Sequence, residues 1–114
     1  MKQCYEKFKA LGEETRFRIV AVLAKSGREL CACDIINSLG KAQYTISKAM
    51  SVLVGSGVVI ERREGKMMMY SINSKDMQVK ALLQAVKIVS DSQCGVKEDY
   101  DRLAGCLSSG IKVK

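Results

Sequence analysis

The residues of this chain best suited to chemistry are its five cysteines, which have no histidine to accompany them. Two of them, Cys31 and Cys33, are separated by a single residue in the segment ELCACD at positions 29–34. Their thiolates are soft ligands, suited to As(III) and Sb(III) and also to Cd(II) and Pb(II). Because imidazole is absent, catalysis by serine–histidine or cysteine–histidine pairs is excluded, and we expect no enzyme activity.

Cys31 and Cys33 can converge on one ion if the backbone between them is extended or turning. Two residues apart within a regular helix, they would point in different directions. We therefore expect the pair at the beginning of a helix, where unpaired N–H groups favour the thiolate form that binds. As(III) and Sb(III) normally take three sulfurs, so the third must come from Cys4, Cys94 or Cys106. Cys94 and Cys106 could instead pair with each other or form a second site.

The composition predicts one globular domain, residues 1–114, with an aliphatic core. Apolar residues make up 47% of the chain and aromatic residues 5%. The odd number of cysteines argues against a complete disulfide framework. No apolar run is long enough to span a bilayer and the N-terminus lacks the apolar stretch of a secretory signal, so we expect a cytoplasmic protein with no membrane partner. The net charge of +7 favours a polyanionic partner.

The spacing of apolar residues predicts four helices in the first half of the chain. Asp34 favours a helix start through capping or the helix dipole, after a short extended segment, and Gly40 supplies the left-handed residue that ends that helix. Two short helices joined by a Gly-containing turn make a helix-turn-helix, predicted over about residues 34–55. The helix before it is expected to bury one face. The four predicted helices span residues 5–11, 13–25, 34–39 and 42–54.

After this helix-turn-helix the apolar pattern changes from a helical to an extended period. Residues 58–63 and 67–72 are predicted to form two strands joined by a tight turn. A hairpin in this place is a wing, which would cover about residues 58–72. The three consecutive methionines Met67–Met69 alternate between the faces of a strand, which disfavours a copper site and predicts that they fill the core.

The last part of the chain is expected to be helical. Ser74 is predicted to cap a long helix over residues 75–91, and Gly95 to end it. A weakly amphipathic tail over residues 96–107 could form one further helix. The predicted fold class is therefore α+β, mainly α: a winged helix-turn-helix with flanking helices.

Two groups of polar side chains are predicted to contact double-stranded DNA. One lies on the solvent side of the second helix of the helix-turn-helix, available to the major groove, and the other lies in the wing, near the backbone or minor groove. The first group is Gln43, Tyr44, Thr45, Ser47, Lys48 and Ser51, and the second is Arg62, Arg63 and Lys66.

Several motifs occur in an order that carries a family resemblance. They are ALGEETR at residues 10–16, ELCACDI at 29–35, Gln43 with TIS at 45–47, LVGSGVV at 53–59, and REGK at 63–66 followed by YSI at 70–72. Together they resemble the ArsR/SmtB family of metal-sensing transcription factors, above all its arsenic-responsive ArsR type. The resemblance covers about residues 8–73, and its most specific part is the C-x-C motif at the first helix of the helix-turn-helix.

The resemblance implies a homodimeric repressor of metal or metalloid resistance genes. It implies that operator DNA is released when As(III) or Sb(III) binds cysteine thiolates, with Cd(II) and Pb(II) as further inducers. Terminal helices over about residues 2–11 and 75–107 would form the dimer interface. By likeness to cadmium and lead sensors of the family, Cys4 would reach Cys31 and Cys33 of the partner subunit. The zinc site that relatives carry on the last helix needs histidine and is not expected here.

The chain departs from the family pattern at three places. Ile36 stands where the best-known arsenic repressors carry a third cysteine, so another sulfur must complete the site. Tyr44 stands where proline is usual, and Lys48-Ala49 where a basic residue and histidine are usual. The last two departures bear on the operator sequence rather than on DNA binding itself.

An alternative interpretation keeps the fold and the DNA binding but changes the signal. The repressor would respond to thiol oxidation or to sulfide, by disulfide or persulfide formation. Cys94 and Cys106 would form the switch, or either of them with Cys31 or Cys33.

Overall fold

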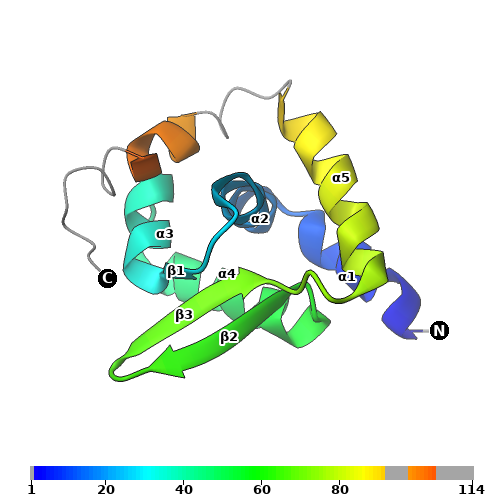
Figure 1. The fold of residues 1–114 in the computed structure, drawn as a ribbon, viewed down its shortest axis with the longest axis horizontal. Helices are drawn as coiled ribbons and strands as arrows, with labels where there is room; N and C mark the ends of the chain where they lie inside the picture. Colours follow the sequence, from blue (N-terminus) through cyan, green and yellow to red (C-terminus); the bar gives the residue numbers. More distant parts are fainter. Residues whose placement is uncertain (1, 92–97, 105–114) are drawn as a thin grey trace.

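The computed structural model describes residues 2–91 and 98–104, and it is mainly helical with a small antiparallel sheet (Figure 1). A hairpin follows two short helices, so the predicted winged helix-turn-helix is confirmed. The elements are α1 (Lys2–Leu11), α2 (Glu14–Ser26), β1 (Leu30–Cys31), α3 (Ala32–Leu39), α4 (Gln43–Ser56), β2 (Val59–Glu64), β3 (Met67–Ile72) and α5 (Met77–Asp91).

Helix α2 lies in the middle of the fold, with the other helices around it (Figure 1). Five consecutive residues, Ile19–Leu23, are buried, whereas a surface helix buries one stripe. Helices α1, α3, α4 and α5 and strand β3 all contact α2. The prediction that this helix buries a single face is therefore wrong, because neighbours cover it on several sides.

Helices α3 and α4 form the helix-turn-helix. The turn between them begins at Gly40, whose φ of 68° is a left-handed conformation that side-chain-bearing residues rarely adopt. The N–H of Gly40 donates to the carbonyl oxygen of Ile36 at 2.9 Å and so ends α3. Ile46, Met50 and Leu53 are buried and pack α4 against the core.

The sheet has three strands in the order β1-β3-β2, all antiparallel. The hairpin of β2 and β3 is the predicted wing. Its third strand, β1, is the short extended segment before α3, and it pairs Leu30 with Tyr70 and Cys31 with Met69. The wing and the helix-turn-helix are thus joined by backbone hydrogen bonds and not only by the chain that connects them.

Helix α3 begins earlier than the sequence predicts. It starts at Ala32, with Cys31 in extended conformation as the N-cap residue. Asp34 occupies the third helical position, where its carboxylate accepts a hydrogen bond from the N–H of Cys31 at 3.3 Å. Asp34 therefore supports the helix start from inside the first turn, in a capping box.

Helix α5 begins later than predicted. The carboxylate of Asp76 accepts a hydrogen bond from the N–H of Gln78 at 2.9 Å, and the helix starts at Met77. The prediction that Ser74 caps this helix is therefore wrong: Asp76 satisfies an N–H of its first turn. The predicted break at Gly95 lies outside the described residues.

The methionine run lies outside the hydrophobic core. Met67 is 41% exposed, and Met68 and Met69 are half-buried. The core-facing side of the sheet is formed instead by Leu30, Val59 and the partly buried Tyr70 and Ile72. The prediction that the methionines fill the core is wrong, because the hairpin projects beyond the helices that bury its base (Figure 1).

Residues 98–104 form a helical segment that packs on α2 and α3. Its Asp99 is fully buried, and two nitrogens of the Arg18 guanidinium donate to the two carboxylate oxygens at 2.7 and 2.8 Å. The hydrogen bond from Arg18 to Asp99 raises the pKa of that guanidinium. Arg102 also donates to Asp99, and to the carbonyl oxygen of Ser38 near the end of α3. This network ties the tail to the helix-turn-helix.

No helix within residues 2–91 and 98–104 combines the length and the apolar character that crossing a membrane requires.

Replacing Asp99 by alanine should lower the free energy of unfolding by about 3 kcal/mol, because Arg18 loses its buried partner. Urea denaturation measures this change. Asp101→Ala is the matched control, since Asp101 lies in the same segment but is exposed, and it should cost less than about 0.5 kcal/mol. Equal losses in the two variants would contradict the role of the network.

Candidate nucleic-acid interface and thiol site

The polar side chains predicted to enter the major groove all lie on the solvent face of α4. Its opposite face is anchored by Ile46, Ala49, Met50 and Leu53, which are buried. A rigid helix with a polar outer face is what the major groove accepts. The exposed residues are Gln43, Tyr44, Thr45, Ser47, Lys48 and Ser51, as predicted.

Tyr44 is the most exposed aromatic side chain of the described residues, at 72%. The ammonium of Lys48 lies 5.6 Å from the centre of its ring. This cation–π contact holds the two side chains together at the outer face of the helix. A flat ring beside a cation suits contact with bases and phosphates.

The three predicted wing cations are in different environments. Arg62 donates two hydrogen bonds to the carboxylate of Glu29, at 2.6 and 2.8 Å, and a third to Glu64 at 2.7 Å. The bonds to Glu29 raise the pKa of Arg62 most, and the bond to Glu64 raises it further. In turn, the hydrogen bond from Arg62 lowers the pKa of Glu29. Arg63 and Lys66 are exposed near the tip, without an acidic partner among the described ion pairs. The charge that the wing offers to phosphates is therefore mainly theirs.

Cys31 and Cys33 lie where β1 passes into α3, as the sequence predicts. Cys31 is 2% exposed and belongs to the sheet, while Cys33 is exposed in the first turn of the helix. Both are thiols. Beside them, Asp34 is 3% exposed, and its Oδ1 atom has no hydrogen-bond partner. An ion bound by both cysteines would therefore lie at the beginning of α3, between the buried Cys31 and the exposed Cys33.

Within the described part of the chain, no three side chains among cysteine, aspartate and glutamate are close enough to hold a metal ion. Cys4 belongs to α1, which lies on the side of the molecule away from β1 and α3 (Figure 1). A contact between Cys4 and the C-x-C motif would thus have to come from a second subunit. Cys94 and Cys106 lie outside the described residues.

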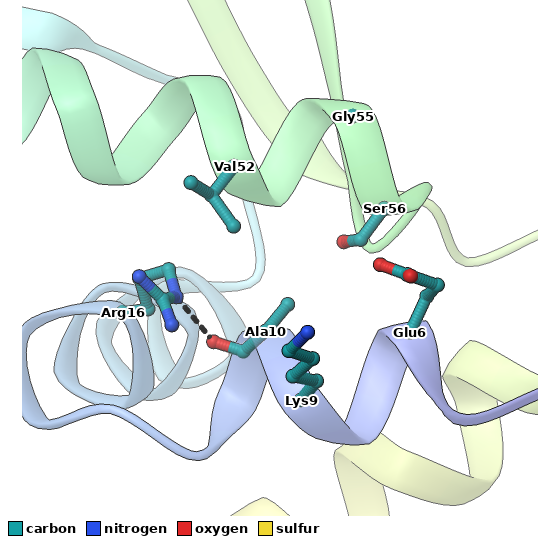
Figure 2. Close-up of a pocket in the computed structure, with 7 residues that line it drawn as sticks. All are labelled: Glu6, Lys9, Ala10, Arg16, Val52, Gly55 and Ser56. Atoms are coloured by element: carbon teal, nitrogen blue, oxygen red, sulfur yellow. Dashed lines mark hydrogen bonds between the residues drawn. The ribbon is translucent and has the colours of Figure 1, made fainter. Parts of the chain in front are cut away.

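A cleft of about 390 Å³, lined by both charged and apolar residues, separates α1 from the second half of α4 (Figure 2). Arg16 from α2 reaches its floor and donates to the carbonyl oxygen of Ala10, near the end of α1, at 2.7 Å. Lys9 and Glu6 line its α1 side, and neither Cys31 nor Cys33 is among its described lining residues. The cleft is therefore separate from the thiol site.

Three features of the site escape prediction from the sequence: the bond between Glu29 and Arg62, the pairing of Cys31 with Met69, and the buried Oδ1 of Asp34. The opposite charges of Glu29 and Arg62 are visible in the sequence. Only the register of the sheet, however, brings these residues together from 33 positions apart.

Comparisons with known proteins agree with this geometry. The sequence profile of the family described as bacterial regulatory protein, arsR family, matches residues 13–61. The chain is 41% identical over 86 residues to an HTH-type transcriptional regulator of Methanocaldococcus jannaschii, covering 72% of this chain and 93% of that one. It is 34% identical over 98 residues to an arsenic resistance transcriptional regulator of Pseudomonas putida, covering 85% and 74%.

A cadmium resistance regulatory protein of Staphylococcus aureus is 39% identical over 77 residues; the match covers 68% of this chain and 61% of that protein. Among solved structures, the homodimeric winged helix-turn-helix DNA-binding domain of a possible ArsR-family regulator from Mycobacterium bovis is similar, with a TM-score of 0.67 and 30% identity. That match covers 79% of this chain and 80% of the other.

Replacing Lys66 by alanine should weaken binding to duplex DNA of every sequence and lower the slope of log affinity against log salt by about 1. Fluorescence anisotropy between about 50 and 200 mM salt measures both. Lys87→Ala, an exposed lysine of α5 remote from the wing, should leave the slope unchanged. A slope that is the same for Lys66→Ala and the parent would remove Lys66 from the interface.

Proposed function

This chain belongs to the ArsR family of DNA-binding transcriptional repressors, and we propose that it represses metal and metalloid resistance genes until As(III) or Sb(III) binds its cysteine thiolates. Cd(II) and Pb(II) are further candidate inducers, in keeping with the cadmium resistance relative. Its place of action is the cytoplasm, where the operator lies.

The DNA-binding part rests on α4 and the wing. Exposed polar side chains on one face of α4 suit direct contact with base edges, and Gln43 suits adenine. Arg63 and Lys66 lie near the tip of the hairpin, where they suit contact with phosphates or the minor groove. The net charge of +7 favours the same partner.

The homodimer would form through α1 and α5. Both helices expose large apolar side chains: Phe8 is 66% exposed, Met77 80% and Ile88 72%. Lys7 of α1 lies 3.8 Å from Asp76, just before α5, so the beginning of α5 lies beside α1. Exposed large apolar side chains of this kind are typical of subunit interfaces. The described part of the tail, residues 98–104, packs instead on its own α2 and α3.

The main support for the sensing mechanism is that Cys31 belongs to two structural elements at once. It is the last residue of β1, which pairs with the wing strand β3, and also the N-cap residue of α3 in the helix-turn-helix. An ion that draws Cys31 toward Cys33 and a third sulfur acts on both DNA-contacting parts at once. Ion binding needs deprotonated thiols, so each thiol that binds releases its proton to solvent.

The third sulfur is assigned to Cys4 of the partner subunit. Within one subunit α1 lies away from the C-x-C motif, so the partner subunit is the source that we propose for this sulfur (Figure 1). An ion held between subunits would change the spacing of the two α4 helices. A coupling free energy of about 1–3 kcal/mol would lower operator affinity about 5–150-fold.

The test is operator release by As(III) in cysteine variants. The parent protein should lose about 5–150-fold in operator affinity when As(III) is added, and the double variant Cys31→Ser/Cys33→Ser should lose none. Fluorescence anisotropy with labelled operator measures this. Cys4→Ser should reduce the number of sulfurs around arsenic from three to two by X-ray absorption, whereas Cys94→Ser and Cys106→Ser should leave three.

If As(III) lowered the operator affinity of the double serine variant as much as that of the parent protein, the proposal would be contradicted. Release by a mild oxidant but not by As(III) would instead favour the alternative, a redox-switched repressor.

A further inference from the structure

The wing carries a sulfur atom beside the C-x-C motif that the sensing mechanism does not use. We propose that the thioether of Met69 joins Cys31 and Cys33 in a three-sulfur site for Cu(I), within one subunit. The inference rests on the proposed role of the C-x-C motif and extends it to a second kind of ion.

The register of the sheet places Met69 directly opposite Cys31. Partner residues of an antiparallel pair project from the same face, with Cβ atoms about 4.5–5.5 Å apart. A methionine side chain is unbranched and has three rotatable bonds, so it adapts to irregular surroundings. Met69 can therefore bring its sulfur to an ion bound at Cys31 without any change in the backbone.

The same register separates Met69 from its neighbours in the run. Met67 and Met69 lie on the face of Cys31, while Met68 lies on the other face, opposite Arg63. Met68 therefore has the same chemistry as Met69 and is also half-buried, but it lies on the face away from Cys31. It is a natural control.

The exposure of Met69 also favours a role other than packing. It is half-buried and lies outside the core cluster, so its thioether remains available on the outer face of the wing. On that face Met69 lies between Cys31 on β1 and Arg62 on β2. The Arg62 guanidinium is held by Glu64 on its own strand and by Glu29, two residues before Cys31.

The chemistry of the three donors fits Cu(I). Soft thiolate and thioether ligands select Cu(I), and methionine adds a sulfur without adding charge or a proton to be lost. As(III) prefers three thiolates, and Met69 cannot supply one. The chain would thus use one pair of cysteines for two ions, completed by Cys4 of the partner for As(III) and by Met69 for Cu(I).

The experiment uses the full-length dimer labelled with selenomethionine, loaded with one Cu(I) per subunit under anaerobic conditions. X-ray absorption at the copper edge should show a Cu–Se bond. The bond should disappear in labelled Met69→Leu and remain in labelled Met68→Leu. Leucine keeps nearly the same volume, so both variants should fold and bind operator as the parent does.

Affinity supplies a second readout, on unlabelled protein. Competition with a Cu(I) chelator should show affinity falling about tenfold or more in Met69→Leu, and less than about twofold in Met68→Leu. Absence of a Cu–Se bond in the parent, or equal Cu(I) affinities in the two variants, would overturn the inference.

These outcomes are separate from those that test the proposed function. If Cys31→Ser/Cys33→Ser abolishes release by As(III) while Met69→Leu and Met68→Leu bind Cu(I) equally, only the copper site is wrong. If the double serine variant still releases operator with As(III), the proposed function is wrong, and the Cu–Se bond still decides the copper site.

Discussion

The short pairing of β1 with β3 determines how the two DNA-contacting parts of this protein are related. Two residues, Leu30 and Cys31, add a third strand to the wing, and the next residue begins α3. Backbone hydrogen bonds are directional and costly to leave unmade in a buried place, so this junction cannot shift without affecting both sides. A thiol at the junction is therefore well placed to control the relation between wing and helix-turn-helix.

The surroundings of the junction hold it in one arrangement. On the inner side, Leu30 is buried in the core that surrounds α2. On the outer side, Glu29 is bound to Arg62, so the residues flanking β1 are tied to the neighbouring strands by charge as well as by pairing. At the far end of α3, the hydroxyl of Ser38 donates to the carbonyl oxygen of Asp99, and the carbonyl oxygen of Ser38 accepts a hydrogen bond from Arg102. Helix α3 is thus held at both ends, which suits an element that must have two defined positions.

Local patterns in the sequence predict most of the elements, and long-range contacts explain the rest. The apolar period of α4 and the Gly65 turn of the hairpin are local, and both were predicted to within about two residues. Asp34 was correctly associated with the start of α3 but acts from the third helical position, because the capping box depends on backbone geometry. The beginning of α5 gives a second example, since the sequence favours Ser74 as its cap whereas Asp76 takes that role.

The features that carry the functional argument are the least local ones. The alternation of strand faces predicts that Met67–Met69 fill the core, whereas the structure shows Met67 exposed and Met69 paired with Cys31. Likewise, the buried Asp99 meets Arg18 from 81 positions away, and nothing in the sequence around either residue specifies that partner. The sequence predicts the position of the C-x-C motif, but it does not predict that Cys31 pairs with the wing.

Amide hydrogen exchange on the dimer, with and without As(III), tests most directly whether the junction couples the two parts. The account predicts that As(III) changes exchange both in the first turn of α3 and along β3, where Met69 and Tyr70 pair with β1. A change confined to α3, with β3 and the wing turn exchanging as in the ion-free protein, would contradict it.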